Sequence, residues 1–130
     1  MDRDNIKLNT FIIDIEIYDC KIHVMNSLSD EDFQSYILER GSIDKIERTE
    51  SIAAFWTIPC KNKRNEYFLD FKKKLKKDSY SMNTICHECT HATFDIMKWV
   101  NIPYVVDVTD EAYCCLNALI FQKVYEGIYK

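Results

Sequence analysis

Apolar and polar residues alternate with a period of two over much of the first half of the chain, which is typical of half-buried strands. Four segments show this alternation or are rich in strand-forming residues, and we expect strands at about Asn9–Tyr18, Lys21–Met25, Ser51–Ile58 and Glu66–Lys72. Asp19 and Cys20 mark a tight connection, and the polar segment Cys60–Asn65 is typical of a hairpin loop. The strand at Glu66–Lys72 is expected to present a free edge.

Helical spacing replaces the alternation in three other segments, which predicts helices over about Asp30–Arg40, Ser81–Asn101 and Asp110–Tyr125. Ser29 is the expected N-cap of the first helix, and Gly41 is its expected stop. Thr109 is the expected N-cap of the last helix, after the short apolar connection Tyr104–Val108. The order of elements predicts an α+β fold in which a small, mostly antiparallel sheet packs on the last two helices.

A length of 130 residues fits one domain over residues 1–130, because a chain of this size buries a sufficient core by itself. The formal net charge of -4 disfavours a nucleic-acid partner, for which a basic surface is expected. The polar N-terminus and the short apolar runs predict neither a secretory signal nor a membrane span. We therefore expect a cytoplasmic protein with free thiols at its six cysteines, four of which fall in segments predicted to be buried helix.

The segment that carries chemistry is the H-E-x-x-H pattern formed by His87, Glu88 and His91 inside the second predicted helix. Residues four apart lie on one helix face, so both imidazoles can reach one Zn²⁺ ion. Glu88 beside them is the expected general base that takes a proton from a metal-activated water. The alternative is a chance pair of histidines on a solvated helix surface.

A catalytic zinc ion usually has three protein ligands, so a third is expected downstream of His91. Glu111 opens the next helix, which a short connection can fold back over the first, and we select it as the third ligand. Asp110 is the second choice, and Asp95 fits better as an acceptor that orients an imidazole N–H. The alternative is that Asp110 and Glu111 only favour the positive end of the helix dipole.

The motif helix and the D-E-A-Y segment that opens the next one resemble small phage-type and bacterial proteins of the minimal gluzincin kind. The matching residues lie in the last ~50 positions and are His87, Glu88, His91, Ala92, Asp110, Glu111, Ala112 and Tyr113. The resemblance implies a zincin-like fold, a zinc ion, a base glutamate and an edge strand beside the cleft. It implies no particular substrate.

Larger gluzincins carry a further C-terminal domain that supplies a His or Tyr to stabilise the transition state. In its place we select Tyr113 over Tyr104 and Tyr80 as the oxyanion donor, and the alternative is that Tyr113 is a core tyrosine. The C-x-x-C pair Cys86 and Cys89 is a weaker competitor for zinc, since the two thiols and the histidines point in different directions around one helix.

These features together predict a zinc-dependent hydrolase that acts on a peptide or protein substrate. The second hypothesis is a phage or bacterial accessory protein that keeps the fold but acts by binding, with a structural or vestigial metal. We expect no membrane partner, and the sequence leaves the oligomeric state open.

Overall fold

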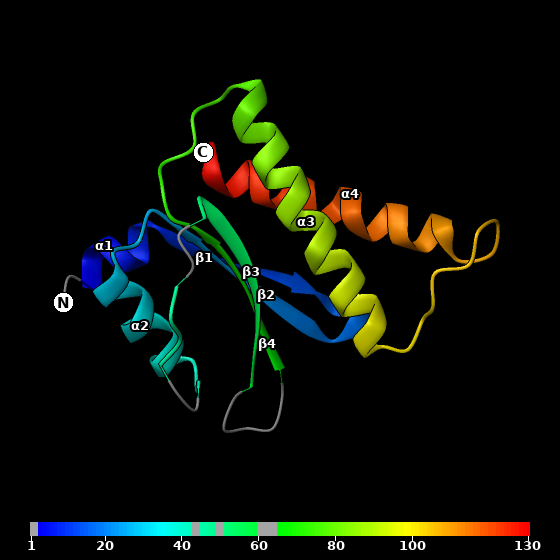
Figure 1. Ribbon diagram of the computed structural model, residues 1–130, viewed down its shortest axis with the longest axis horizontal. Coiled ribbons are helices and arrows are strands. Elements are labelled where there is room, and N and C mark those ends of the chain that lie inside the picture. Colours follow the sequence, from blue (N-terminus) through cyan, green and yellow to red (C-terminus); the bar gives the residue numbers. More distant parts are fainter. Residues whose placement is uncertain (1–2, 43–44, 49–50, 60–64) are drawn as a thin grey trace.

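The computed structural model describes residues 3–42, 45–48, 51–59 and 65–130 of the chain, which contain both helices and strands (Figure 1). The helices and strands are, in order, α1 Arg3–Leu8, β1 Thr10–Ile15, the 3-10 helix η1 Glu16–Tyr18, β2 Cys20–Asn26, α2 Asp30–Glu39, β3 Ala53–Pro59, β4 Asn65–Phe71, α3 Ser79–Trp99 and α4 Asp110–Ile128. The predicted α+β class and order are confirmed, and α1 and η1 are additions to it. The first strand stops at Ile15 because η1 and the left-handed Asp19 (φ 49°) form the connection to β2.

The sheet is mixed, with the strand order β1-β2-β4-β3. β1 pairs with β2 and β3 pairs with β4 in antiparallel fashion, but β2 and β4 run parallel in the centre. The prediction that β4 presents a free edge is therefore wrong, and β3 is the edge strand on that side. The physical reason is that residues 67–71 are buried on both faces of the strand, as expected for a central position.

Helices cover both faces of the sheet, which gives three layers (Figure 1). Alternate residues of β2 and β4 point to opposite faces. Ile22 and Leu69 pack in the core beneath α3 and α4, whereas Met25 and Phe68 pack with residues of α1 and α2. The predicted packing of the sheet on the motif helix and the C-terminal helix is thus present. No helix in the described ranges has both the length and the apolar character that a membrane crossing requires.

The helix ends agree with the sequence expectation in two cases and differ in one. Ser29 caps α2, since its side chain accepts a hydrogen bond from the Asp32 amide at 3.1 Å. Gly41 follows α2 with φ 100°, a conformation that glycine adopts readily. Thr109 makes no side-chain cap to α4, because its hydroxyl accepts from the Val105 amide at 2.7 Å and donates to the Pro103 carbonyl at 2.6 Å. Its hydroxyl therefore orders the preceding loop.

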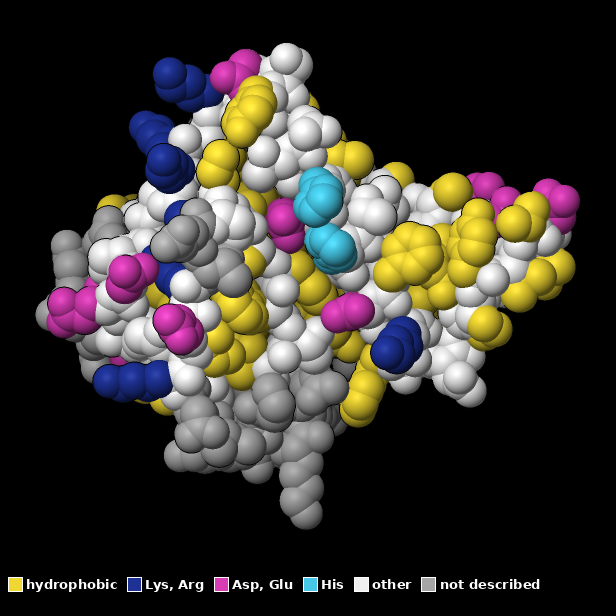
Figure 2. Space-filling model, viewed as in Figure 1, with side chains coloured by type: hydrophobic (Ala, Val, Ile, Leu, Met, Phe, Trp, Pro, Cys, Tyr) yellow, Lys and Arg dark blue, Asp and Glu magenta, His cyan; other side chains and the backbone are white. Residues whose placement is uncertain are grey.

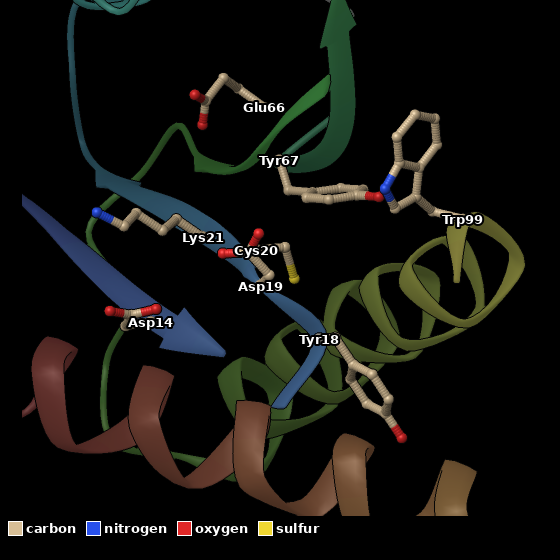
Figure 3. A pocket seen from close by; sticks show the side chains of 8 residues that line it. All are labelled: Asp14, Tyr18, Asp19, Cys20, Lys21, Glu66, Tyr67 and Trp99. Atoms are coloured by element: carbon tan, nitrogen blue, oxygen red, sulfur yellow. The ribbon is translucent and has the colours of Figure 1, made fainter. Parts of the chain in front are cut away.

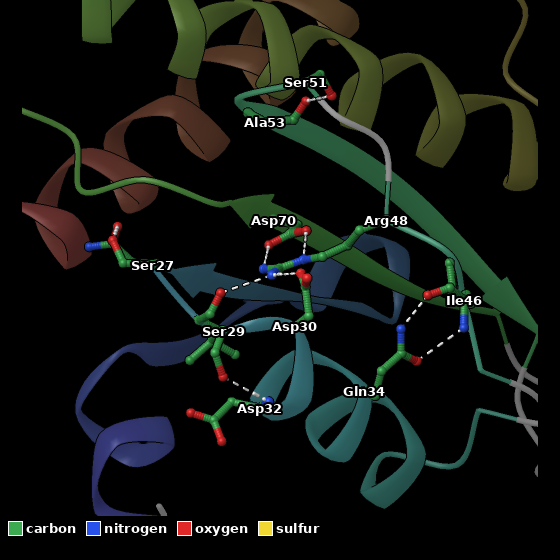
Figure 4. A network of polar contacts seen from close by, with 12 residues as sticks. Ser27, Ser29, Asp30, Asp32, Gln34, Ile46, Arg48, Ser51, Ala53 and Asp70 are labelled. Carbon is green, nitrogen blue, oxygen red and sulfur yellow. Dashed lines mark hydrogen bonds and ion pairs between the residues drawn. The ribbon is translucent and has the colours of Figure 1, made fainter.

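A buried ion pair links Arg48, in the segment before β3, to Asp70 of β4 (Figure 4). Arg48 donates from Nη2 to Asp70 Oδ1 at 2.6 Å and from Nε to Asp70 Oδ2 at 2.8 Å. Its Nη1 also donates to the Leu28 carbonyl and to Asp30 Oδ1, both at 2.9 Å, and the guanidinium lies 4.5 Å from the ring centroid of Phe33. The Asp70 side chain is fully buried and that of Arg48 nearly so, which makes this pair a structural centre on the α2 side of the sheet.

Candidate metal site

His87 and His91 lie on the exposed face of α3, one helical turn apart. Their Nε2 atoms are 3.2 Å from each other, and the ring planes are inclined by 76°. Figure 2 shows histidine side chains together on one face of the molecule, with an acidic side chain beside them and a hydrophobic patch to their right. The sequence prediction that the two imidazoles converge is therefore met by the local geometry of the helix.

The separation of the two nitrogens fits a shared metal ion. Two ligand nitrogens, each about 2.0–2.1 Å from one zinc ion and about 110° apart, would be roughly 3.4 Å from each other. The same 3.2 Å is also a normal length for a hydrogen bond between a neutral imidazole N–H and the other ring's lone pair. Both groups are exposed, so an ion from solvent can reach them.

Glu88 is next to His87 in the sequence and is largely buried, with 7% of its surface exposed. Burial raises the pKa of its carboxyl above the ordinary value, and the neighbouring imidazoles of His91 and His87 offset part of that rise. A carboxylate with a raised pKa is a stronger base than an exposed glutamate. Its position next to the imidazole pair is what a general base requires.

Glu111 does not join the histidines. α3 and α4 contact each other where Thr93 Oγ1 donates to Asn117 Oδ1 at 3.1 Å. Glu111 is about 9 Å before that point along α4, toward the loop, whereas the histidines precede Thr93 in the other direction along α3. In the part of the chain that the structure describes, no three His, Cys, Asp or Glu side chains form a group that could hold a metal ion.

The first turn of α4 contains both Asp110 and Glu111, which matches the alternative in which they interact with the helix dipole. Glu111 Oε1 also lies 3.6 Å from the thiol of Cys115 on the next turn. The expected fold-back of the helices does occur, but the long α3 and the loop after it carry the start of α4 beyond the histidines. This is why spacing along the sequence did not predict the position of Glu111.

Two other candidates make contacts away from the histidines. Asp95 Oδ2 accepts a hydrogen bond from Thr57 Oγ1 of β3 at 3.0 Å. Tyr113 is buried, and its hydroxyl donates to the Ile102 carbonyl at 2.5 Å. This is the position of the core tyrosine that was the alternative at the sequence level, and the phenol anchors the loop after α3.

The cysteines in the described ranges do not form a competing metal site. The described ones, Cys20, Cys86, Cys89, Cys114 and Cys115, are all free thiols, as predicted. Of the four helical cysteines only Cys89 is buried, so the expectation that all four pack as apolar core residues is wrong for the other three. They lie on outward faces of α3 and α4 that periodicity alone did not separate from the inward faces.

His23 is a core residue and is 4% exposed. Its Nδ1 lies 3.0 Å from the Tyr36 hydroxyl and its Nε2 lies 3.0 Å from Glu66 Oε2, while the ring stacks on Phe68 at 4.6 Å. Burial lowers the pKa of His23, although the hydrogen bond and the charge of Glu66 act in the opposite direction. The folded state therefore favours the neutral ring.

This shift predicts a loss of stability on acidification. Below the unfolded pKa of about 6.5 the unfolded chain binds a proton at His23 that the folded chain binds less readily. We expect the free energy of unfolding to fall by up to about 1 kcal/mol between pH 7 and pH 5.5. The measurement is urea unfolding of a His87→Gln/His91→Gln variant, in which His23 is the last histidine of the three in the chain. A further His23→Phe change should remove this loss of stability, and the same pH dependence in the double and the triple variant would contradict the prediction.

Comparisons of this chain with protein-family models, with curated proteins and with solved structures found no match.

Proposed function

We propose that the protein is a zinc-dependent hydrolase of peptides with a zincin-like arrangement, in which His87 and His91 hold the metal and Glu88 is the general base. The observation that carries the proposal is the 3.2 Å separation of the two Nε2 atoms on an exposed helix face. The buried carboxylate next to them, with its raised pKa, supports the catalytic role.

A zinc ion, when bound, supplies Lewis acidity that activates a water molecule and polarises a carbonyl group. The imidazoles of His87 and His91 would hold the ion, and both side chains are exposed to solvent, from which a substrate can approach. An Oε atom of Glu88 accepts a proton from the attacking water and then delivers it to the leaving nitrogen. Partial burial of Glu88 limits competing hydration of the carboxylate.

The edge strand supports a peptide substrate. β3 lies at the end of the described sheet and contacts α3, and Thr57 of β3 is hydrogen-bonded to Asp95, one turn after His91. An extended peptide that pairs with the edge of β3 would run along the same side of α3 as the histidines. We therefore propose β3, in place of β4, as the edge strand that pairs with the substrate.

The test is elemental analysis of protein made without a histidine tag and dialysed against zinc. We expect about one zinc ion per chain in the wild type and loss of most of it in both His87→Ala and His91→Ala, because each change leaves a single imidazole. Glu111→Ala is the matched control, since the structure places that carboxylate on the far side of the helix contact. It should keep the zinc content of the wild type.

Zinc content in the wild type no higher than in His87→Ala would refute the metal site and leave the imidazoles as a hydrogen-bonded pair. Loss of zinc in Glu111→Ala as well would restore the sequence prediction for the third ligand. It would require a different placement of the start of α4.

One observation favours the second hypothesis, a protein that acts by binding. The described residues supply two nitrogen ligands, one fewer than catalytic zinc sites usually have. In that case the metal orders the surface of α3 and Glu88 has no chemical role. A Glu88→Gln variant that keeps its zinc distinguishes hydrolysis from binding, because only hydrolysis requires the carboxylate.

A further inference from the structure

A cavity of about 230 Å³ lies between the β1–β2 connection, β4 and the C-terminal end of α3 (Figure 3). Its walls combine the carboxylates of Asp14, Asp19 and Glu66 with the rings of Tyr67 and Trp99. These residues come from β1, β4, α3 and the connection before β2, so no local sequence motif predicts the cavity. The combination of acids and aromatic faces is the chemistry that binds organic cations.

The cavity is negative on balance. Lys21 also lines it, but Figure 3 shows this side chain on the opposite side from Tyr67 and Trp99. The thiol of Cys20 lies among the acids, and its pKa is raised to about 11, first by burial and then by the charges of Asp14 and Asp19. A further negative charge is therefore unfavourable in this cavity, and a positively charged ligand is favoured.

Tyr67 provides an independent sign of a ligand. Its side chain is 2% exposed, yet its hydroxyl has no hydrogen-bond partner among the described residues, and it points toward Trp99 at the cavity wall (Figure 3). The pKa of this phenol is raised to about 12, chiefly by burial and then by the charges of Cys20 and Asp95. The hydroxyl at the end of this buried side chain is thus open to a hydrogen bond from a ligand group at the cavity wall.

We propose that this cavity binds the guanidinium group of an arginine in the peptide substrate. A guanidinium is planar, stacks on aromatic rings and donates in pairs to carboxylates, which suits walls made of Trp99 and Asp19. The Tyr67 oxygen accepts one further N–H. A lysine ammonium is not planar and does not donate two parallel hydrogen bonds, so it matches fewer of these groups.

The proposal rests on the proposed function and adds a substrate class to it. Trp99 lies eight residues after His91 on α3, or about 12 Å along the helix. A second hollow, lined by Thr57, Tyr67, Asp95, Lys98 and Trp99, shares Tyr67 and Trp99 with the acidic cavity, and its Asp95 lies one turn after His91. An extended peptide covers 12 Å with about three to four residues, so the arginine would lie that far from the bond that is cleaved.

The experiment uses metal-free protein, so that it succeeds or fails independently of the zinc site. N-acetyl-arginine amide and N-acetyl-citrulline amide are titrated in parallel, with the indole N–H signal of Trp99 as the NMR readout. Citrulline has nearly the same shape but no charge. We expect arginine to bind about tenfold more tightly, since hydrogen bonds to charged groups exceed neutral ones by roughly one such factor.

Asp19→Asn removes one charge without a change of shape, and asparagine tolerates the left-handed φ of 49° at this position. The matched control is Asp107→Asn, another aspartate with a left-handed φ, 63°, which lies in the exposed loop after α3. Asp19→Asn should weaken arginine binding about three- to tenfold, and Asp107→Asn should leave it unchanged.

Equal affinity for arginine and citrulline would overturn the proposal, as would equal weakening by the two aspartate variants. Tighter binding of N-acetyl-lysine amide than of the arginine compound would overturn the assignment of a guanidinium. Failure to bind zinc in the separate elemental analysis would leave these titrations as they are and would refute only the catalytic role.

Discussion

Replacement of Asp70 by alanine is expected to lower the free energy of unfolding by about 3–5 kcal/mol, because it leaves the buried guanidinium of Arg48 without its counter-charge. Asp70 is fully buried and binds Arg48 through two hydrogen bonds of 2.6 and 2.8 Å. The loss of the carboxylate also removes one of the anchors of the segment before β3. Urea unfolding at pH 7, followed by circular dichroism, measures the change.

Asp30→Ala is the matched control. Asp30 binds the same guanidinium at 2.9 Å, but its carboxylate is 89% exposed, so water replaces the lost partner. We expect a much smaller effect than that of Asp70→Ala. A double change of Arg48→Met and Asp70→Leu should recover most of the stability, since an apolar pair leaves no buried charge. Equal effects of the two aspartate variants would show that the Arg48–Asp70 ion pair is not buried.

The second large effect is expected on catalysis. Glu88→Gln should lower kcat by about 10²–10⁴-fold, because glutamine keeps the shape of glutamate but cannot accept a proton from water. The zinc content should not change, since Glu88 is not one of the two imidazole groups proposed to hold the ion. The measurement is hydrolysis of an arginine-containing peptide library by zinc-loaded protein, with product masses as the readout.

Asp110→Asn is the control for this experiment, since it removes a carboxylate of the same chain at the start of α4. Its turnover should equal that of the wild type. If zinc-loaded wild type and Glu88→Gln are equally inert toward the library, the hydrolase proposal fails and the protein acts by binding. If both are equally active, another group is the base.

Features of the chain that depend on neighbours along the sequence were predictable. The turn between His87 and His91 is fixed by α-helical geometry, so their convergence follows from a spacing of four. The Ser29 cap follows from its hydroxyl and the acidic turn after it. The α+β order follows from the change of period at about residue 81.

Features that depend on which distant elements meet were not predictable. The central position of β4 results from its parallel pairing with β2, a strand that lies far from it in the sequence. The position of Glu111 depends on where α4 crosses α3, which the Thr93–Asn117 contact fixes and the sequence spacing does not. The acidic cavity was not predictable for the same reason, since Asp19 and Trp99 are far apart in the chain.

The parallel pairing of β2 with β4 also constrains the order in which the chain folds. The hairpin of β1 and β2 is local, but β2 receives its second neighbour only after α2 and β3 have been made. Such a non-local contact closes a long loop and is slow to form. During synthesis the apolar side of β2 stays uncovered until β4 inserts and the α3–α4 pair docks, so nascent or truncated chains that stop before α3 are expected to aggregate.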